Sequence, residues 1–238
     1  MTGKTIVILQ SNYLPWKGYF DLMAAADEFL LFDEVQFTKN DWRNRNRIRT
    51  GQGTQWLTIP VVTSGRFGQT VAEAEVVQGD WAAKHWKALA QNYAHAPFFG
   101  AYAHTLERAF AECAALSHLS AVNRRLIEVT AGLLGITTPL TDATRYAFSG
   151  DRNGRLVTLC QSAAATHYLT GPSARDYLDL DLFARAGIAV RFMDYSGYEP
   201  YPQVHGGFEG DVSALDLLFN TGPEARGHLQ CRNGRDWA

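Results

Sequence analysis

The stretch that decides the fold is TIVILQSNYLPWKGYFDLMAAADEFLLFDEV, which runs from Thr5 to Val35. Residues 5–9 form a continuous apolar run, which is typical of a strand buried on both faces. Residues 19–26 favour a helix because they are rich in alanine and carry apolar side chains at helical spacing. Residues 28–33 form a second apolar run that ends in a carboxylate. Strand, helix and strand in this order predict a βαβ unit whose crossover makes the two strands parallel.

The rest of the chain predicts a single α/β domain over residues 1–238, without a linker that would mark a second domain. Residues 56–62 and 71–77 are expected to pair as a short antiparallel flap. Between about residues 81 and 140 the pattern predicts a helical insertion or cover, in three pieces broken near Pro97 and His118. Further helices are expected at 154–165, 174–186 and 213–219, and strands at 167–170 and 188–192. The fold class is therefore a mostly parallel sheet with flanking helices, nucleotidyltransferase-like or Rossmann-like.

Composition excludes several classes of protein. Hydrophobic residues make up 46% of the 238 residues and charged residues 19%, which is ordinary for a globular protein with a sizeable core. The formal net charge of −2 gives no general attraction to nucleic acid or anionic membranes. The widely spaced Cys113, Cys160 and Cys231 indicate buried free thiols rather than disulfides, and no metal-ligand spacing occurs. Without a signal sequence or a long apolar run, we expect a cytoplasmic protein with no membrane span.

The strand ends are where a ligand is expected, because open parallel sheets bind ligands beyond the carboxyl ends of their strands. Residues 10–19, 33–49 and 171–177 follow predicted strands and are expected to converge there. In the first of these stretches, free backbone N–H groups at the helix start favour a phosphate. Lys17 adds a charge, Gly18 would allow a close approach, and Trp16 and Tyr19 offer ring faces. The alternative is that the two aromatic residues cover the core and that Gly18 only turns the chain.

Arginine recurs at every second position from Arg43 to Arg49, with asparagine between. In a strand these side chains would share one face and extend over roughly 20 Å, at about 3.3 Å per residue. That arrangement suits an extended diphosphate ligand held through guanidinium contacts. The alternatives are a solvated edge strand and a nucleic-acid groove, and one basic strand is thin support for the latter.

Several motifs together resemble the WbqC-like protein family. The matching stretches are residues 9–21, 32–37, 44–48, 56–61, 168–178, 201–203 and 213–220, so that the resemblance runs nearly end to end. The last of them places Ser213 and Asp216 at the spacing of a capping box.

The resemblance implies a role in O-antigen or other polysaccharide biosynthesis. Its proposed activity is transfer of an amino acid, glycine in particular, to the amino group of a nucleotide-linked amino sugar. The expected partners are that nucleotide sugar and an amino acid. ATP with Mg²⁺, neither bound tightly, would activate the carboxyl group. The alternative is a non-catalytic nucleotide-binding or nucleotide-sugar-binding module of a glycan assembly pathway. The oligomeric state stays open.

The motifs also propose individual site residues. Asp33 is the expected general base, with a turn-capping role as the alternative, and Lys17 is a second catalytic candidate. Trp16 and Tyr19 stand near where a similar nucleotidyltransferase pattern carries histidines, so adenylation would need Lys17 or an arginine in their place. The expected substrate-binding and nucleotide-binding residues are Gln10, Asn12, Tyr13, Pro15, Trp16, Gly18, Tyr19, Gln36, Arg45, Arg47, Gly171, Tyr177, Tyr201 and Gln203.

Overall fold

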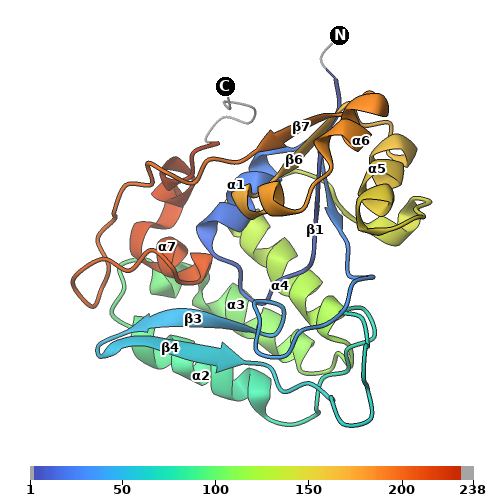
Figure 1. Cartoon of the computed structure of the whole chain (residues 1–238). Helices are drawn as coiled ribbons and strands as arrows, with labels where there is room; N and C mark the ends of the chain where they lie inside the picture. The colour runs from blue at the N-terminus through green and yellow to red at the C-terminus, as the bar shows by residue number, and fades with distance from the viewer. Residues whose placement is uncertain (1–2, 232–238) are drawn as a thin grey trace.

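The computed structural model describes residues 3–231, which form an α/β fold around a five-stranded parallel sheet (Figure 1). The strand order is β5-β2-β1-β6-β7. The strands are β1 (Thr5–Leu9), β2 (Glu28–Leu31), β5 (Leu140–Asp142), β6 (His167–Thr170) and β7 (Ala189–Phe192). The predicted βαβ unit is confirmed, since β1 pairs in parallel with β2. We did not predict β5, because its three residues are too few to show a period.

The centre of the sheet is where its connections reverse direction. β1 lies between β2 and β6, with Ile6 opposite both Glu28 and Tyr168. The chain leaves β1 toward β2 and β5, then returns across the sheet to β6 and β7. Because the connections diverge at β1 and β6, a crevice is expected beyond the carboxyl ends of these two strands.

Seven α-helices of the described residues cover the sheet and extend below it. They are α1 (Lys17–Ala25), α2 (Trp81–Tyr93), α3 (Phe99–Cys113), α4 (Leu119–Leu133), α5 (Arg152–Ser162), α6 (Leu180–Arg185) and α7 (Ala214–Thr221). Short 3₁₀ turns lie at Ala143–Arg145, Pro172–Asp176 and Gly222–His228. The helix breaks predicted near Pro97 and His118 are confirmed. The helix predicted at 174–186 is wrong in part, because a 3₁₀ turn and the short α6 replace it.

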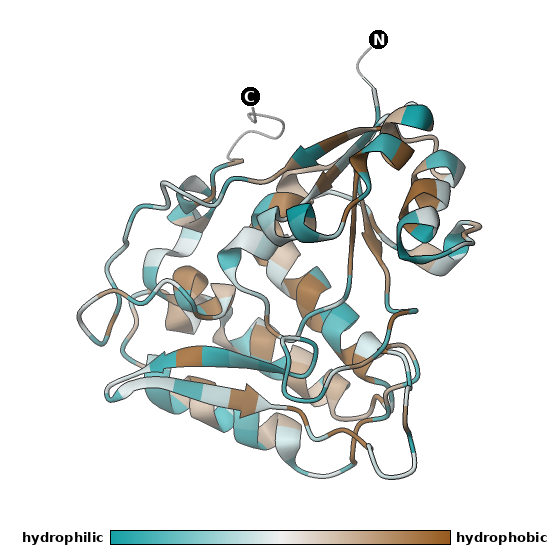
Figure 2. Ribbon diagram, in the orientation of Figure 1, coloured by the Kyte–Doolittle hydropathy of each residue, from teal (hydrophilic) through white to brown (hydrophobic). Residues whose placement is uncertain are grey.

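Side chains that alternate along the strands belong to two hydrophobic clusters, one on each face of the sheet. Val7 and Phe29 pack with α1 and the helices α2 to α4 and α7, whereas Ile6, Ile8 and Leu30 pack with α5 and α6. Figure 2 shows this as hydrophobic colour along the central strands. No helix of the described residues is long and apolar enough to cross a membrane.

The small antiparallel sheet exists, but its strands are not those expected. β3 (Arg45–Thr50) pairs with β4 (Gly53–Thr58), and the two lie beside α2 in Figure 1. Gly53, at φ +123°, supplies the left-handed backbone that this tight hairpin needs. Residues 71–77 make only isolated bridges, such as Val61 with Val76. The expected pairing of 56–62 with 71–77 is therefore limited to one short antiparallel contact, in which the Val62 amide donates to the Glu75 carbonyl and the Val77 amide to the Pro60 carbonyl.

Gly18 is required by the protein's own packing. It lies in the first turn of α1, and a Cβ built on it would stand 2.3 Å from Cζ2 of Trp16. The Trp16 ring is held there by Tyr195 and Tyr198, with ring centroids 5.0 and 5.9 Å away. The expectation that Gly18 admits a ligand to the backbone is therefore wrong, because an indole already occupies that approach.

Replacing Gly18 by alanine is expected to lower the free energy of unfolding by about 1–3 kcal/mol, because Trp16 must be displaced. The matched control is Gly132→Ala, an exposed position of α4 where a Cβ meets nothing within 4 Å. That change should raise stability by up to about 1 kcal/mol, since glycine is a poor helix former. Urea denaturation midpoints measure both, and equal effects of the two changes would refute the packing argument.

Candidate functional site

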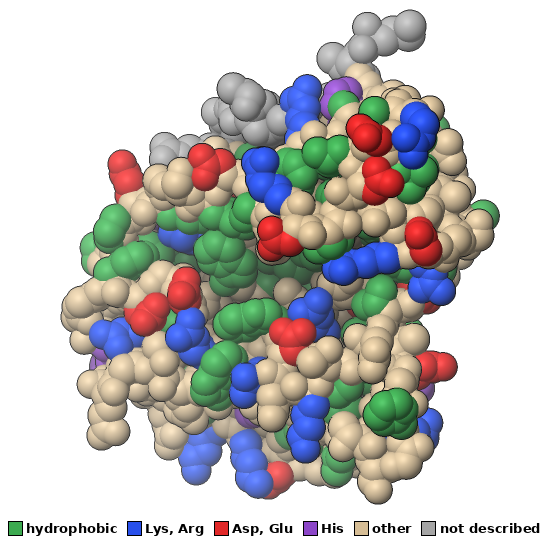
Figure 3. Space-filling view, in the orientation of Figure 1, with side chains coloured by type: hydrophobic (Ala, Val, Ile, Leu, Met, Phe, Trp, Pro, Cys, Tyr) green, Lys and Arg blue, Asp and Glu red, His purple; other side chains and the backbone are tan. Residues whose placement is uncertain are grey.

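A large cavity opens beyond the carboxyl end of the central strand β1, and Tyr168 of the neighbouring β6 also lines it. It has a volume of about 710 Å³ and lies between the carboxyl ends of β1 and β2 and the start of α5. We call it the crevice. Its lining residues include Gln10, Gln36, Glu34, Arg43, Arg152, Arg155 and Tyr177. In Figure 3 a hollowed band crosses this face of the molecule, with hydrophobic side chains within it and basic side chains along its edges.

Three arginines give the crevice a local positive charge that the whole chain lacks. Arg43 precedes β3, whereas Arg152 and Arg155 belong to the first turns of α5. The Arg152 guanidinium carbon lies 3.4 Å from the ring centroid of Tyr177, and Arg155 donates to the Glu34 carbonyl over 3.3 Å. A planar guanidinium held on an aromatic face still presents its edge to a ligand, so this lining suits an anion.

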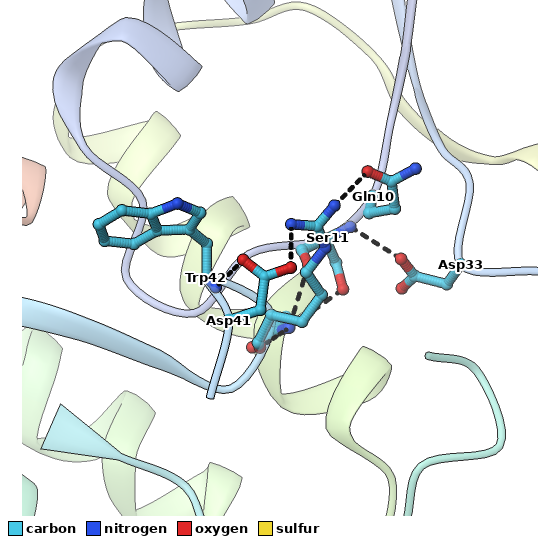
Figure 4. Close-up of polar contacts among 7 residues, drawn as sticks. Gln10, Ser11, Asp33, Asp41 and Trp42 are labelled. Atoms are coloured by element: carbon cyan, nitrogen blue, oxygen red, sulfur yellow. Dashed lines mark hydrogen bonds and ion pairs between the residues drawn. The ribbon is translucent and has the colours of Figure 1, made fainter. Parts of the chain in front are cut away.

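A hydrogen-bonded network beneath the crevice ties the strand-end segments together (Figure 4). The backbone N–H of Ser11 donates to Asp33 Oδ1 over 2.7 Å. Arg43 donates to both Asp41 Oδ2 and Gln10 Oε1, over 2.8 Å each. Asn123 of α4 donates to Ser11 Oγ over 3.1 Å and to the Arg43 carbonyl over 2.9 Å. The predicted convergence of the first two strand-end stretches is therefore confirmed.

Two adjacent carboxyl groups stand at the end of β2. Asp33 is buried, and burial raises its pKa, with Asp142 adding to the rise and the Ser11 amide opposing it. Burial also raises the pKa of Glu34, and the charges of Asp33 and Asp142 add to this rise.

Asp33 lines a separate hollow of about 290 Å³ beside Arg124, whereas Glu34 borders both that hollow and the crevice. Of these two neighbours, only Glu34 lines the crevice. The other carboxyl group in the crevice lining, Asp151, accepts from the Gly154 amide as the cap of α5.

A second, smaller cavity of about 280 Å³ lies on the other side of the same segment. We call it the tryptophan hollow, because Trp16 and Trp42 both line it. Asn12, Pro15, Asn46, Arg47 and Asp211 complete the lining. The two cavities adjoin, since Trp42 faces the hollow and the next residue, Arg43, faces the crevice.

The arginine series divides between these places. Arg45 and Arg47 alternate with buried residues of β3, as predicted for a strand. Arg45 stacks on Trp56 at 4.1 Å, and Arg47 lies 3.4 Å from Asp211. Arg49 instead donates to backbone carbonyls of residues 53 and 206. The expectation that all four arginines share one face is wrong, because Arg43 precedes the strand and turns toward Gln10.

The structure places some predicted site residues in the core instead. Tyr13 donates or accepts a 2.7 Å hydrogen bond with His85, and Tyr19 donates to the Gln10 carbonyl over 3.2 Å. Tyr201 and Gln203 both donate to Asp216 Oδ1, over 2.8 and 2.7 Å. None of these four side chains lines the crevice or the tryptophan hollow. Gly171 follows β6 at the start of a 3₁₀ turn and lines neither cavity.

Asp216 is a buried acceptor rather than part of a capping box. Ser213 Oγ caps α7 by accepting from the Leu215 amide, as its position predicted. The Asp216 carboxylate also accepts from Tyr93 and Asn220, so that it organises the segment above α7. Burial raises the pKa of Asp216, whereas its hydrogen-bond donors lower it.

Sequence reasoning missed Arg152, Arg155 and Glu34. A signal for the two arginines was present, because Asp151 caps α5 by accepting from the Gly154 amide, and caps are readable from sequence. Their relation to the crevice was not readable, since it depends on α5 packing against β1 and β6. Sequence reasoning chose Asp33 over its neighbour Glu34, because the sequence does not show which of two adjacent carboxyl groups faces the cavity at a strand end.

Comparison with known proteins gives one family match and one similar curated protein. Residues 10–228 match the model of the WbqC-like protein family. An uncharacterized protein of Mycobacterium tuberculosis, Rv1507c, is 49% identical over 230 residues, which cover 96% of this chain and 99% of the relative. No solved structure matches the chain.

The Tyr13–His85 contact gives a test of the strand-end packing. Burial lowers the pKa of His85 to about 4, below the ordinary value of 6.5. Between these values the unfolded chain binds a proton that the folded protein does not, so stability falls as the pH falls from 6.5. We expect the wild type to lose about 2 kcal/mol more than His85→Asn between pH 7.5 and pH 5 in urea unfolding. An equal loss would show that His85 titrates as if exposed.

Proposed function

The chain belongs to the WbqC-like protein family, and from this membership we propose that it acylates a nucleotide-linked amino sugar in O-antigen or other polysaccharide biosynthesis. The acyl group is an amino acid of the glycine type, and the acceptor is the amino group of the sugar. The observation that carries this proposal is the crevice of about 710 Å³, which is lined by three arginines and lies beyond the carboxyl ends of the parallel strands β1 and β2. Crevices of this kind hold nucleotides in open α/β sheets.

The lining residues match the parts of such a substrate. Its diphosphate would lie against Arg43, Arg152 and Arg155, which supply charge-assisted hydrogen bonds. Gln10 and Gln36 offer amides for sugar hydroxyl groups, and the exposed Tyr177 ring offers a stacking face. The adjoining tryptophan hollow gives aromatic walls for a further ring.

The reaction forms one amide bond. The neutral sugar amine attacks the activated carboxyl carbon of the amino acid, the bond to the leaving group breaks, and the attacking nitrogen loses a proton. Glu34 borders the crevice and is the group we assign as proton acceptor, and its pKa is raised by burial and, to a smaller extent, by the charge of Asp33. Asp33 itself stays a candidate for this role. Lys17 does not line the crevice, and a catalytic role for it stays a prediction.

ATP-dependent activation of the carboxyl group is part of the proposal, but the helix start expected to bind ATP does not fit its phosphates. The Trp16 ring packs against the Cα of Gly18, and the Tyr19 amide already donates to the Trp16 carbonyl over 3.1 Å. Among residues 3–231 no three carboxylate, histidine or cysteine side chains are placed to hold a metal ion. We therefore derive no step through ATP or Mg²⁺.

A second candidate is a non-catalytic binding module that delivers the nucleotide sugar. The burial of both residues first expected to be catalytic, Lys17 and Asp33, favours it. The two candidates differ in one observable: only the transferase consumes the amino group of the bound sugar.

Binding is tested with a panel of uridine and thymidine diphosphate amino sugars. At about 100 times Kd the ligand should stabilise the protein by about 2.7 kcal/mol, seen as a raised Tm. Arg152→Gln should weaken binding by about 1.5–3 kcal/mol, because a guanidinium–phosphate contact is lost. Arg185→Gln, on the exposed side of α6, is the matched control and should leave affinity unchanged. No shift across the whole panel would refute both candidates.

Turnover is tested with the sugar that binds, glycine and ATP, by following loss of the amino group and release of pyrophosphate. Glu34→Gln should lower kcat by about 100-fold and leave KM nearly unchanged, because the proton acceptor is lost while binding groups remain. The kcat of the wild type should fall at low pH, below the raised pKa of Glu34. Binding without any product would exclude the transferase and leave the binding module.

A further inference from the structure

One surface segment, residues 204–211, covers three basic side chains that belong to α1 and β3. Its Phe208 ring lies 5.8 Å from Lys17 Nζ. Its Asp211 carboxylate lies 3.4 Å from the Arg47 guanidinium, and its residue 206 carbonyl accepts from Arg49 over 2.8 Å. We call residues 204–211 the cover.

The cover leaves N–H donors of the cations beneath it without hydrogen-bond acceptors. Lys17 is 3% exposed, and its Nζ has no hydrogen-bond partner among the described residues. Nε of Arg47 and Nε of Arg49 are likewise buried without an acceptor. Buried donors without acceptors cost free energy, so such a group needs an explanation. Of the two carboxylates in the cover, Glu209 accepts from the Asp211 amide over 3.1 Å. Asp211 is the one that pairs with a cation, and its side chain is 75% exposed.

Lys17 has aromatic neighbours but no hydrogen-bonding counter-ion. Its Nζ lies over the rings of Tyr198 and Tyr201, at 4.2 and 5.4 Å. The nearby Asp21 is already used, since it accepts from Tyr198 and from the backbone amide of residue 230. Burial lowers the pKa of Lys17, and Asp21 only opposes that effect. The aromatic rings accommodate the ammonium group but leave its N–H donors free for another acceptor.

The cover is anchored at its start and closed by Gln203 further along. The Val204 amide donates to Asn220 Oδ1 over 2.9 Å, and His205 Nε2 lies 2.7 Å from the Asn92 carbonyl oxygen. The part that can move is therefore residues 206–211.

Gln203 forms two hydrogen bonds with the backbone of Glu209, over 2.9 and 3.0 Å, which close the base of the cover. Between them, Gly206 and Gly207 have φ values of +67° and +64°, and the left-handed backbone costs glycine nothing. Its contacts with Arg47 and Arg49 are polar and partly exposed, and pairs of this kind are weak.

We propose that Arg47 and Lys17 form a binding subsite for a phosphate or diphosphate group, and that the cover occupies it, with the Asp211 carboxylate in the position of the incoming anion. An anion that displaces Asp211 from Arg47 also lifts Phe208 from Lys17, because only two residues separate Phe208 from Asp211 in the chain. The Arg47 end of this subsite opens into the tryptophan hollow, which Asp211 also lines. The inference rests on the proposed function only for the anionic character of the ligand.

The test uses Asp211→Asn with inorganic pyrophosphate as the probe, by calorimetry at constant ionic strength. Removing an internal competitor should tighten pyrophosphate binding by about two- to fivefold, the factor that corresponds to an exposed ion pair. The matched control is Glu107→Gln, which removes one exposed charge from α3. Unchanged or weaker binding in Asp211→Asn, or equal tightening in Glu107→Gln, would overturn the proposal.

A second measurement follows the Lys17 amine by acetylation with acetic anhydride and mass spectrometry, with the exposed Lys87 as internal reference. Lys17 should label several-fold faster, relative to Lys87, in Asp211→Asn than in the wild type. An unchanged ratio would show that the segment does not uncover Lys17 and would overturn the proposal. If pyrophosphate behaves as expected while no nucleotide sugar binds, the proposed function fails and the subsite stands.

Discussion

The hydrogen bond from the Ser11 amide to the Asp33 carboxylate is the constraint on which the site depends. It joins the segment that follows β1 to the one that follows β2, directly above the sheet. Asn123 of α4 then holds Ser11 and the Arg43 carbonyl together, so that the chain before β3 is attached to the same point. The positions of Gln10, Arg43 and Trp42, and hence the walls of both cavities, follow from this junction. Burial destabilises the charged form of the Asp33 carboxyl group and so raises its pKa. A polar site held in place inside a protein usually carries this cost.

Periodicity made the central fold readable from sequence. The apolar runs of β1 and β2 and the alanine-rich α1 have the lengths and spacings that decide between strand and helix. β5 and the hairpin of β3 and β4 were missed or misplaced for opposite reasons. β5 is too short to carry a pattern, whereas residues 71–77 carry a strand pattern but pack as an irregular segment over the core.

The candidate site was readable only as far as it lies on strand ends. Gln10, Asn12, Trp16, Arg47 and Tyr177 line cavities because topology places them there. Tyr13 and Tyr19 also follow β1, but their rings are buried in the core. The direction in which each ring points depends on how the chain turns after the strand. Arg152 and Arg155 come from more than a hundred residues away in the chain, and only the packing of α5 brings them to β1. Contacts between residues so far apart in the chain produce no pattern in the local sequence.

Asp41 supports two consecutive residues that face different cavities. One of its oxygens accepts from the Trp42 amide and the other from the Arg43 guanidinium. A ligand that draws Arg43 toward the crevice therefore alters the support of Trp42 in the tryptophan hollow. Thermodynamic reciprocity then requires that whatever factor the first ligand imposes on the second is returned in full. Asp41 is thus a direct physical link between the residues that line the two cavities.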